Sequence, residues 1–437
     1  MQKFKRPRIF SDRDSVNKIN SEAKNIYLAM LNSGHGKLDK NNKVQFCGMV
    51  HHPEDGIAVF LPRESKTGTS DCDFETARLT MKALARFSIE TSNRQFQDDG
   101  ETGNPELLSV IKKLSDDFVK NGLFFERLRN ETLNSGKANW GKTIKRELPM
   151  PNKFKQPIFT NIHTSRSSRS HDTLLAQIQA AVIKEIHQAH SWWLDSISGR
   201  ISELSSCIRP QFPRSIWANK LDSLMPSLYS SRSIFLANYL RYYLRKTRTS
   251  SDGSFVFGLN DFHTVWETIL KKTIERSPYD RLEKWNSKLP IPVYSKKDNS
   301  EQESKLKGMQ TDIILEDEIG YTIIDAKYYS AKTANTAPGW SDIVKQFFYE
   351  KALREIVDSP EKVPSKIQNI FIFPSKTNDG PLTHVALQHR NLDEAVSDYF
   401  PPISCMYVSV RRALELYVSR KQGITVPNKI KVSSDTH

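Results

Sequence analysis

The stretch TDIILEDEIGYTIIDAKYY, residues 311–329, decides the fold that we expect for this chain. It consists of two β-branched runs separated by a polar turn that ends in Gly320, a pattern that predicts a β-hairpin. Side chains two positions apart lie on one face of a strand, so Asp325 and Lys327 are expected to project together. Pairing of the two strands would bring Asp312, which opens the first run, close to that face.

The segments around this hairpin predict an α/β core with a mixed sheet flanked by helices. A polar linker, residues 295–308, precedes the hairpin, and residues 405–418 are expected to add a strand and a closing helix. The extreme C-terminus, residues 428–437, is expected to fray. The core elements expected, in order, are helix 261–276, strand 311–316, strand 321–329, helix 341–357 and strand 368–374.

The upstream part predicts mostly helices with a small β element. Residues 44–50 and 57–62 are short apolar runs on either side of HHPEDG, which predicts a hairpin. Residues 134–159 are basic, aromatic and rich in Pro, and together with the polar residues 160–172 they predict an exposed loop or arm. Helices are expected at 14–32, 73–93, 105–121, 173–205 and about 215–246.

The change from long helices to mixed α/β near SSDG, residues 250–253, predicts a domain boundary. We therefore expect three regions: an N-terminal α+β region over 1–135, a basic arm and helical region over 136–250, and the α/β region over 251–437. A chain of 437 residues is long enough for two or three domains.

Composition favours a folded protein with a polyanionic partner. Hydrophobic residues make up 38% and charged residues 26% of the chain, and the formal net charge is +14. The sequence contains no apolar stretch long enough to span a membrane, and the N-terminus lacks the apolar region of a secretory signal, so we expect a cytoplasmic protein. The cysteines lack metal-binding or redox spacing and are expected to be reduced and structural: Cys47, Cys72, Cys207 and Cys405.

The paired strands carry residue types that suit a divalent metal. Mg²⁺ takes oxygen ligands, usually one or two carboxylates with waters and substrate phosphates, and Asp312 and Asp325 can supply the carboxylates. A lysine beside carboxylates keeps its charge, so Lys327 suits electrostatic stabilisation of a phosphate or of the attacking water. An Asp-x-Lys pair on an exposed strand is also common without catalysis, so this reading depends on further residues.

Two helices provide such residues. In FHTVWETIL, residues 262–270, Glu267 borders an apolar stripe, where a carboxylate is costly unless it is paired or binds a metal. In SDIVKQFFYEKAL, residues 341–353, Gln346 and Tyr349 share one face of a helix that follows the hairpin and are candidates to contact substrate phosphate. An ordinary solvated Glu and an ordinary amphipathic helix are the competing interpretations.

The arm mixes an aromatic residue with cations, as nucleic-acid-binding segments do. The candidates there are Trp140, Lys142, Lys145 and Arg146, although a solvated loop has the same composition.

The order Glu, Asp, Asp-x-Lys and then a helix with Gln and Tyr resembles the PD-(D/E)xK nuclease superfamily. Within it, the chain is most similar to the LlaJI-type restriction endonucleases and the related McrC subunits. The resemblance rests on FHTVWETIL, TDIIL with YTIIDAKYY, and SDIVKQFFYEKAL, and extends to SGKANWGKTIKRELP (135–149) and the N-terminal apolar runs. Two departures are present: the superfamily's Pro is replaced by Thr311, and Tyr349 follows Gln346 by three residues instead of four.

The resemblance implies a nuclease domain over 251–437 and a recognition or partner-docking domain over 1–135. It assigns Asp312, Asp325, Glu267 and the carbonyl of Ala326 to the metal, and Lys327 and Gln346 to catalysis. The implied activity is Mg²⁺-dependent cleavage of double-stranded DNA, with Mn²⁺ as a substitute, by a type II or type IV restriction enzyme in prokaryotic antiviral defence.

The resemblance also implies partners. They are a McrB-like AAA+ GTPase or ATPase and a DNA methyltransferase of the same system. The resemblance implies that nucleotide hydrolysis is carried out by that AAA+ subunit. The alternatives are a transposon end-cleaving or repair nuclease, and a non-catalytic DNA-binding or regulatory subunit that keeps the nuclease fold.

Overall fold

The chain forms two compact units, Met1–Ser109 together with Ser250–His437, and Val110–Thr249. The predicted boundary at 250–253, most of the polar linker and the C-terminal tail lie outside the described residues. The computed structural model describes residues 6–34, 37–92, 105–195, 198–247, 254–275, 285–291, 293–295, 301–303, 309–316, 320–358, 366–388 and 400–427.

The first unit contains a four-stranded sheet in the order β1-β5-β4-β11. The predicted hairpin is confirmed, because β4 and β5 pair antiparallel around a turn that ends at Gly56. Strand β1 adds parallel to β5, and β11 adds antiparallel to β4. Helix α1 (Val16–Asn32), also predicted, packs on this sheet. The strands are β1 (Arg8–Ser11), β4 (Cys47–His52), β5 (Gly56–Leu61) and β11 (Phe255–Leu259).

A second sheet in the same unit has the order β14-β15-β16-β18-β17. Its inner strands β15, β16 and β18 run parallel, and β14 and β17 pair antiparallel at the two edges. The predicted mixed sheet and its hairpin are therefore confirmed. The strands are β14 (Ile313–Glu316), β15 (Gly320–Ala326), β16 (Lys366–Ser375), β17 (His384–Val385) and β18 (Ile403–Ser409).

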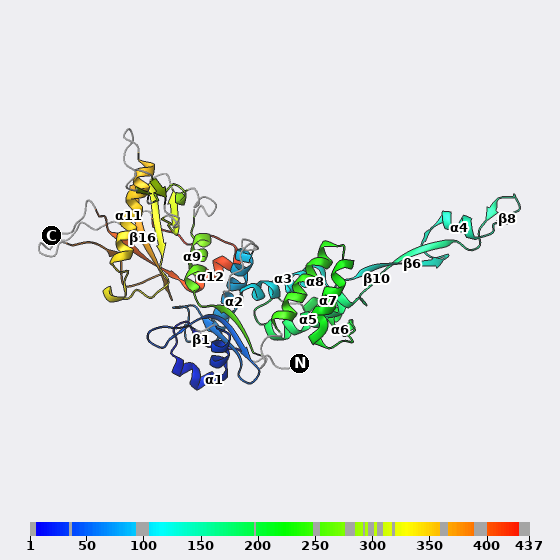
Figure 1. Ribbon diagram of the computed structural model, residues 1–437, viewed down its shortest axis with the longest axis horizontal. Coiled ribbons are helices and arrows are strands. Elements are labelled where there is room, and N and C mark those ends of the chain that lie inside the picture. The colour runs from blue at the N-terminus through cyan, green and yellow to red at the C-terminus, as the bar shows by residue number, and fades with distance from the viewer. Residues whose placement is uncertain are drawn as a thin grey trace. The chain divides into compact units, whose positions relative to one another are not determined.

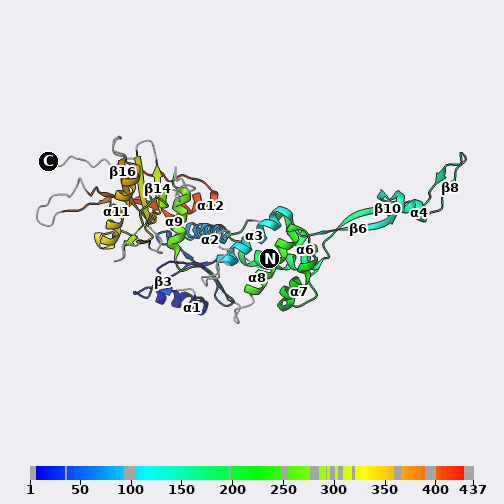
Figure 2. The ribbon, with the colours of Figure 1, turned by 45° about the horizontal axis from the view of Figure 1, so that its top comes forward.

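Helices cover this sheet as the sequence predicts. Helix α11 (Trp340–Val357) packs on β15 and β16, and α9 (Phe262–Thr273) contacts β15 (Figure 2). Helix α9 also contacts α2 (Ser70–Ser92) and α12 (Val410–Ser419), the predicted closing helix. Burial of Phe262, Val265, Trp266, Ile269 and Leu270 fixes the orientation of α9 and confirms the predicted apolar stripe.

A polar cluster joins α2, α9 and α12. The Glu90 carboxylate lies 2.5 Å from Lys272 Nζ and 2.8 Å from Arg86 Nε, and it accepts a hydrogen bond of 2.8 Å from the Tyr417 hydroxyl. Burial raises the pKa of Glu90, but the bonds to Lys272, Arg86 and Tyr417 outweigh it and hold that pKa below its usual value. The cluster therefore fixes α9, the helix that carries Glu267, through charge-assisted bonds.

The second unit consists of helices and a long hairpin that carries further elements at its far end (Figure 1). Strands β6 (Glu126–Leu133) and β10 (His163–Ser170) pair antiparallel over their whole length. The predicted arm is thus a β-ribbon instead of a loop. The far end holds β7 (Lys137–Ala138), α4 (Trp140–Arg146), β8 (Met150–Pro151) and β9 (Pro157–Ile158). The helices are α3 (Pro105–Asn121), α5 (Leu174–His190), α6 (Ile201–Ser206), α7 (Trp217–Leu224) and α8 (Ser231–Lys246), and α3 begins in the first unit.

Two predicted long helices are wrong in extent. The helix expected over 173–205 ends at His190, because Trp192 and Trp193 are buried in a turn that follows it. The helical stretch expected over 215–246 is divided between α7 and α8 by a break that contains Pro226, which lacks the amide hydrogen that a continuous helix needs. The part of the chain before residue 250 also has more β structure than the small element that the sequence predicts.

The remaining elements are short. They are β2 (Lys37–Leu38), β3 (Val44–Gln45), β12 (Val293–Ser295), β13 (Glu301–Glu303) and the 3₁₀ turns Ser198–Arg200, Arg214–Ile216, Met225–Ser227 and Ala334–Thr336. In the part of the chain that the structure describes, no helix has the length and apolar character to cross a membrane.

A glycine pair allows β4 and β11 to approach closely. Gly48 and Gly258 lie directly opposite each other. A Cβ atom on Gly258 would lie 2.4 Å from the Cys47 carbonyl oxygen, and one on Gly48 would lie 2.1 Å from the Phe257 carbonyl oxygen. Both obstacles are backbone atoms, which cannot move away without disturbing the sheet.

We predict that Gly258→Ala lowers the free energy of unfolding by about 1–3 kcal/mol, the usual cost of overpacking. Chemical denaturation followed by circular dichroism would measure the change. Gly141→Ala is the control, since its new Cβ would meet nothing closer than 3.8 Å and alanine favours a helix. Equal stability of Gly258→Ala and the wild type would contradict the close approach.

Candidate active site

The site is built at the carboxyl end of β15, where the strand meets the residue that precedes β14. Ile313 pairs with Ile324, so the register continues to Asp312 opposite Asp325. The Asp312 carboxylate accepts a hydrogen bond of 2.8 Å from the backbone amide of Ala326. Asp325 is only 5% exposed. The hairpin therefore brings the two predicted carboxylates together from opposite strands.

Lys327 lies between two carboxylates. Its Nζ is 2.6 Å from Asp325 Oδ2 and 2.7 Å from Asp342 Oδ1, and its backbone amide bonds to the Ile372 carbonyl at 2.9 Å. Burial lowers the pKa of Lys327, but the two carboxylates outweigh it and raise that pKa above its usual value. The ammonium is therefore charged at neutral pH, as the sequence argument expects.

The charges of the site act on one another. Burial raises the pKa of Asp312 first, the charges of Glu267 and Asp325 raise it further, and the pKa reaches about 7. Burial and Asp325 also raise the pKa of the half-buried Glu267, while Lys271 lowers it. Asp312, Asp325 and Glu267 thus lie close enough to repel one another, which is the arrangement that a divalent cation would relieve.

One face of α11 closes the site. Asp342, Gln346 and Tyr349 follow at positions i, i+4 and i+7. The side chain of Gln346 is fully buried, yet neither its amide oxygen nor its amide nitrogen has a hydrogen-bond partner. The Tyr349 hydroxyl donates a hydrogen bond of 2.6 Å to the Gln310 carbonyl, two residues before Asp312. Tyr349 therefore fixes the strand that carries Asp312, and its predicted contact with nucleic acid stays a prediction.

The first sheet of the unit anchors the strand that carries the site. Tyr328 follows Lys327, and its hydroxyl accepts a bond of 2.9 Å from the Arg63 amide, while the Arg63 side chain bonds the Tyr328 carbonyl at 3.1 Å. Arg63 also pairs with buried Asp12 at 2.9 Å. Removal of one partner of such a buried ion pair would leave a costly uncompensated charge. The contacts of Arg63 with Asp12 and Tyr328 therefore fix the end of β15.

The donor set suits Mg²⁺ in kind. Carboxylate and carbonyl oxygens are the ligands that this hard cation takes, and Asp312, Asp325 and the carbonyl of Ala326 provide them. The unpartnered amide of Gln346 is a further polar group that lacks a partner within the protein. Among the described residues, no group of three or more His, Cys, Asp or Glu side chains is arranged to hold a metal ion. Two carboxylates completed by a carbonyl, waters and phosphate are therefore the set that the geometry offers.

Comparison with known proteins assigns this chain to a family. A sequence profile of the LlaJI restriction endonuclease family matches residues 46–396, which contain every site residue described above except Asp12. The chain belongs to the LlaJI restriction endonuclease family. The resemblance read from the motifs is thereby confirmed.

Individual relatives of this LlaJI family member are distant. The type II restriction enzyme BsuMI component YdjA of Bacillus subtilis (strain 168) is 26% identical over 174 residues, which are 38% of this chain and 34% of that protein. The matched segment therefore spans about a third of that relative.

Two solved structures from Thermococcus gammatolerans are similar at low TM-scores. A half-complex of McrB AAA+ hexamers with bound McrC has a TM-score of 0.42 at 11% identity, covering 94% of this chain and 98% of that chain. A McrBC complex has a TM-score of 0.29 at 12% identity, covering 61% and 86%.

The four residues of the arm that the sequence predicts to bind nucleic acid lie on α4, in the second unit. Trp140 is 53% exposed, and Lys145 and Arg146 are exposed in the last turn of the helix. Lys142 forms an ion pair with Glu131, so its charge is already balanced. Trp140 also packs edge-to-face against the Phe159 ring. Lys145 and Arg146 are exposed cations that form no ion pair among the described residues, and are therefore better placed than Lys142 to meet a ligand.

Sequence reasoning missed two charged residues of the site. Asp342 contacts Lys327, and it could have been found as the acid one helical turn before Gln346. Lys345 is the second: burial lowers its pKa, but Tyr349, Asp325 and Asp312 raise it. That influence shows that the exposed Lys345 ammonium lies near the carboxylates.

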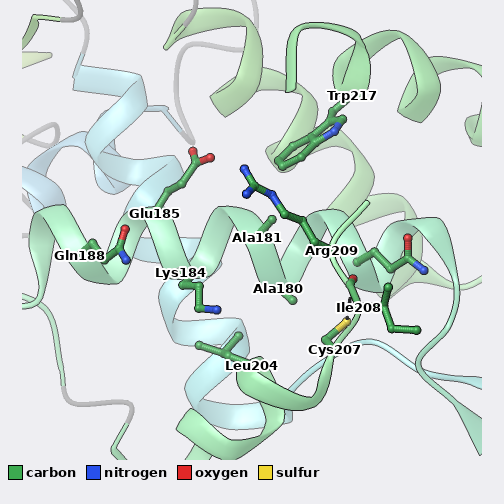
Figure 3. Close-up of a pocket in the computed structure, with 11 residues that line it drawn as sticks. Ala180, Ala181, Lys184, Glu185, Gln188, Leu204, Cys207, Ile208, Arg209 and Trp217 are labelled. Carbon is green, nitrogen blue, oxygen red and sulfur yellow. Dashed lines mark hydrogen bonds between the residues drawn. The ribbon is translucent and has the colours of Figure 1, made fainter. Parts of the chain in front are cut away.

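A cavity of about 250 Å³ lies in the second unit, apart from these residues (Figure 3). Lys184 and Glu185 from α5 line it together with Arg209 and the apolar Leu204 and Trp217. It contains none of the residues that the sequence predicted as catalytic, metal-binding or nucleic-acid-binding.

The raised pKa of Asp312 predicts a cost to stability. The folded-state value of about 7 exceeds the ordinary 3.8, so the folded protein binds more protons than the unfolded chain between these values. The contribution of Asp312 to the free energy of unfolding is fully present below about pH 4 and is lost as the pH rises through about 7. We predict that Asp312→Asn, which keeps an acceptor for the Ala326 amide, is more stable than the wild type at pH 8 with chelator present, by up to about 4 kcal/mol.

Thermal unfolding at pH 5 and pH 8 checks this expectation. The difference in melting temperature between Asp312→Asn and the wild type should be larger at pH 8 than at pH 5. Glu316→Gln, which removes an exposed charge from the same hairpin, should show no such widening. A gap of the same size at both pH values would mean that Asp312 is not held in a strained ionised state.

Proposed function

We propose that this protein is a Mg²⁺-dependent endonuclease that cleaves double-stranded DNA as the nuclease subunit of a restriction system. The observation that carries the proposal is the arrangement at the end of β15. There the Asp312 carboxylate accepts a hydrogen bond from the backbone amide of Ala326, the residue after Asp325. The Lys327 ammonium lies 2.6 Å from the Asp325 carboxylate. Membership of the LlaJI restriction endonuclease family supports the choice of DNA as substrate.

Asp312, Asp325 and the Ala326 carbonyl would hold the metal, with Glu267 beside them. When bound, the metal would acidify a water and neutralise charge on the phosphate. The protein's own residues have separate tasks. The Ala326 amide keeps the Asp312 carboxylate in one orientation. Glu267 is half-buried with a raised pKa, so it suits acceptance of a proton from an attacking water.

Lys327 stabilises negative charge at the scissile phosphate. Its pKa lies above the usual value, so it acts as a cation and hydrogen-bond donor instead of a base. The buried amide of Gln346 can orient the attacking water, because its oxygen and nitrogen have no partner within the protein. Lys345 is exposed near the carboxylates, where it can bind a neighbouring phosphate.

The arm of the second unit is proposed to contact DNA or the partner subunit. Its far end combines exposed apolar side chains with exposed cations: Trp140 is 53%, Ile144 64% and Phe154 83% exposed. Contiguous exposed apolar patches, unlike single exposed apolar residues, often mark interaction sites. The partner proposed is a McrB-like AAA+ NTPase that would supply nucleotide hydrolysis. Residues 136–143, GKANWGKT, match the letters of a P-loop, but they form β7, which pairs antiparallel with β10, and the start of the short helix α4. A DNA methyltransferase of the same system would protect the host.

We predict that Asp325→Asn and Lys327→Ala each lower Mg²⁺-dependent cleavage by at least about a hundredfold while DNA binding remains. A linear duplex assayed with the AAA+ subunit and NTP, with and without EDTA, would measure the loss. Glu316→Gln, exposed on β14, should cleave as the wild type does. Undiminished cleavage by both site variants would refute the proposed site, and a wild type that binds DNA but never cleaves would favour a non-catalytic subunit.

The arm offers a matched pair of variants. We predict that Lys145→Glu with Arg146→Glu weakens DNA binding about tenfold or more and reduces its dependence on salt, because phosphate contacts release counterions. Lys142→Gln should have a smaller effect, since Glu131 already neutralises that lysine. Fluorescence anisotropy across a salt series would compare them. Unchanged DNA binding with lost NTPase stimulation would instead assign the arm to the partner subunit.

A further inference from the structure

We infer that Asp342 is a positioning residue that keeps Lys327 in place when the Asp325 carboxylate binds a divalent cation. This inference rests on the proposed function. Its starting observation is that the single Lys327 ammonium is shared between two carboxylates from different elements. Asp325 at the end of β15 lies 2.6 Å away, and Asp342 in the first turn of α11 lies 2.7 Å away.

The two carboxylates differ in their surroundings. The Asp325 side chain is 7% exposed and is surrounded by other acids, Asp312 and Glu267. The Asp342 side chain is 31% exposed and lies on the helix side of Lys327. The lysine therefore has one partner within the proposed metal site and one outside it.

A metal at the site would change these contacts unequally. A divalent cation on Asp325 would compete with Lys327 for the same oxygens and would repel its ammonium. The long lysine side chain, released from Asp325, has many other conformations available. Asp342 is the anion that remains in contact, so it would retain the ammonium beside the metal instead of letting it swing into solvent.

The alternative is that Asp342 only stabilises the start of α11, where an acid is favourable against the helix dipole. Its described contacts point elsewhere. The Asp342 carboxylate accepts the hydrogen bond from Lys327 Nζ at 2.7 Å, across 15 positions of chain, and it has no recorded bond to the backbone amides of its own helix among the described residues. The helix-capping residue Gly339 has no side chain to do so either. The contact thus joins α11 to β15 through the catalytic lysine.

The test is a double-mutant cycle read as metal affinity, with Mn²⁺ titrated by calorimetry into the full-length protein without DNA. The variants are Asp342→Asn, Lys327→Met, their combination and the control Glu355→Gln, which removes an exposed acid from the far end of the same helix. Asp342→Asn leaves Lys327 with Asp325 alone, so we expect Mn²⁺ affinity to fall about five- to tenfold. In the Lys327→Met background the same change should cost less than about twofold, as should Glu355→Gln.

Each other result is decisive. An equal loss in both backgrounds would make Asp342 a direct ligand, and unchanged affinity with a lower melting temperature would make it a structural residue; either result overturns the inference and leaves the proposed function standing. A wild type that binds no Mn²⁺ would overturn both. Asp342→Glu, which keeps a carboxylate, should recover most of the affinity and most of the cleavage rate lost in Asp342→Asn.

Discussion

Mutual repulsion among Asp312, Asp325 and Glu267 is the constraint around which the first unit is built. Three acids in partly buried positions destabilise the fold, and the pKa of about 7 for Asp312 expresses that cost. The cations around them offset it only in part: Lys327 contacts Asp325, and Lys271 and Lys345 act from α9 and α11. Such a site needs strong surrounding packing, and it lies at the end of β15, an inner strand of a sheet covered by helices.

The supports of this site come from residues distant in sequence. The Arg63 guanidinium joins Asp12 to Tyr328, one residue after Lys327, and so ties the N-terminal sheet to the end of β15. The Glu90 cluster performs the same task for the helix that carries Glu267. The N-terminal residues that precede Ser109 are for this reason part of the unit that contains the site. Their contacts hold the strand that carries the candidate site.

What the sequence could predict follows from the range of the interactions involved. Helical and alternating periodicity is local, so α1, α9, α11 and the β14–β15 hairpin were predictable, and the two-residue spacing of Asp325 and Lys327 placed them on one side of a strand. The pairing of β1 with β5 and of β11 with β4 joins segments about 50 and 200 positions apart, and no local pattern encodes it. The turn after His190 was missed because its buried tryptophans continue the apolar pattern of the helix. Asp342 was missed because an acid near a helix start is commonly explained by its favourable interaction with the helix dipole. Only the contact with Lys327, which the structure shows, indicates another role.

The charge of the whole chain and the charge of the site call for separate explanations. The formal charges of Asp312, Asp325 and Glu267 are balanced by those of Lys327, Lys271 and Lys345, so the site adds little to the net charge of the chain. The formal net charge of +14 must therefore reside mainly elsewhere on the molecule. In the proposed function, attraction of DNA within a Debye length of about 8–10 Å would depend on that distributed charge, which includes the exposed cations of the arm. In the proposed function, the arm therefore contributes mainly to binding and the site mainly to chemistry, so substitutions in the arm should change the dependence on salt more than the dependence on metal.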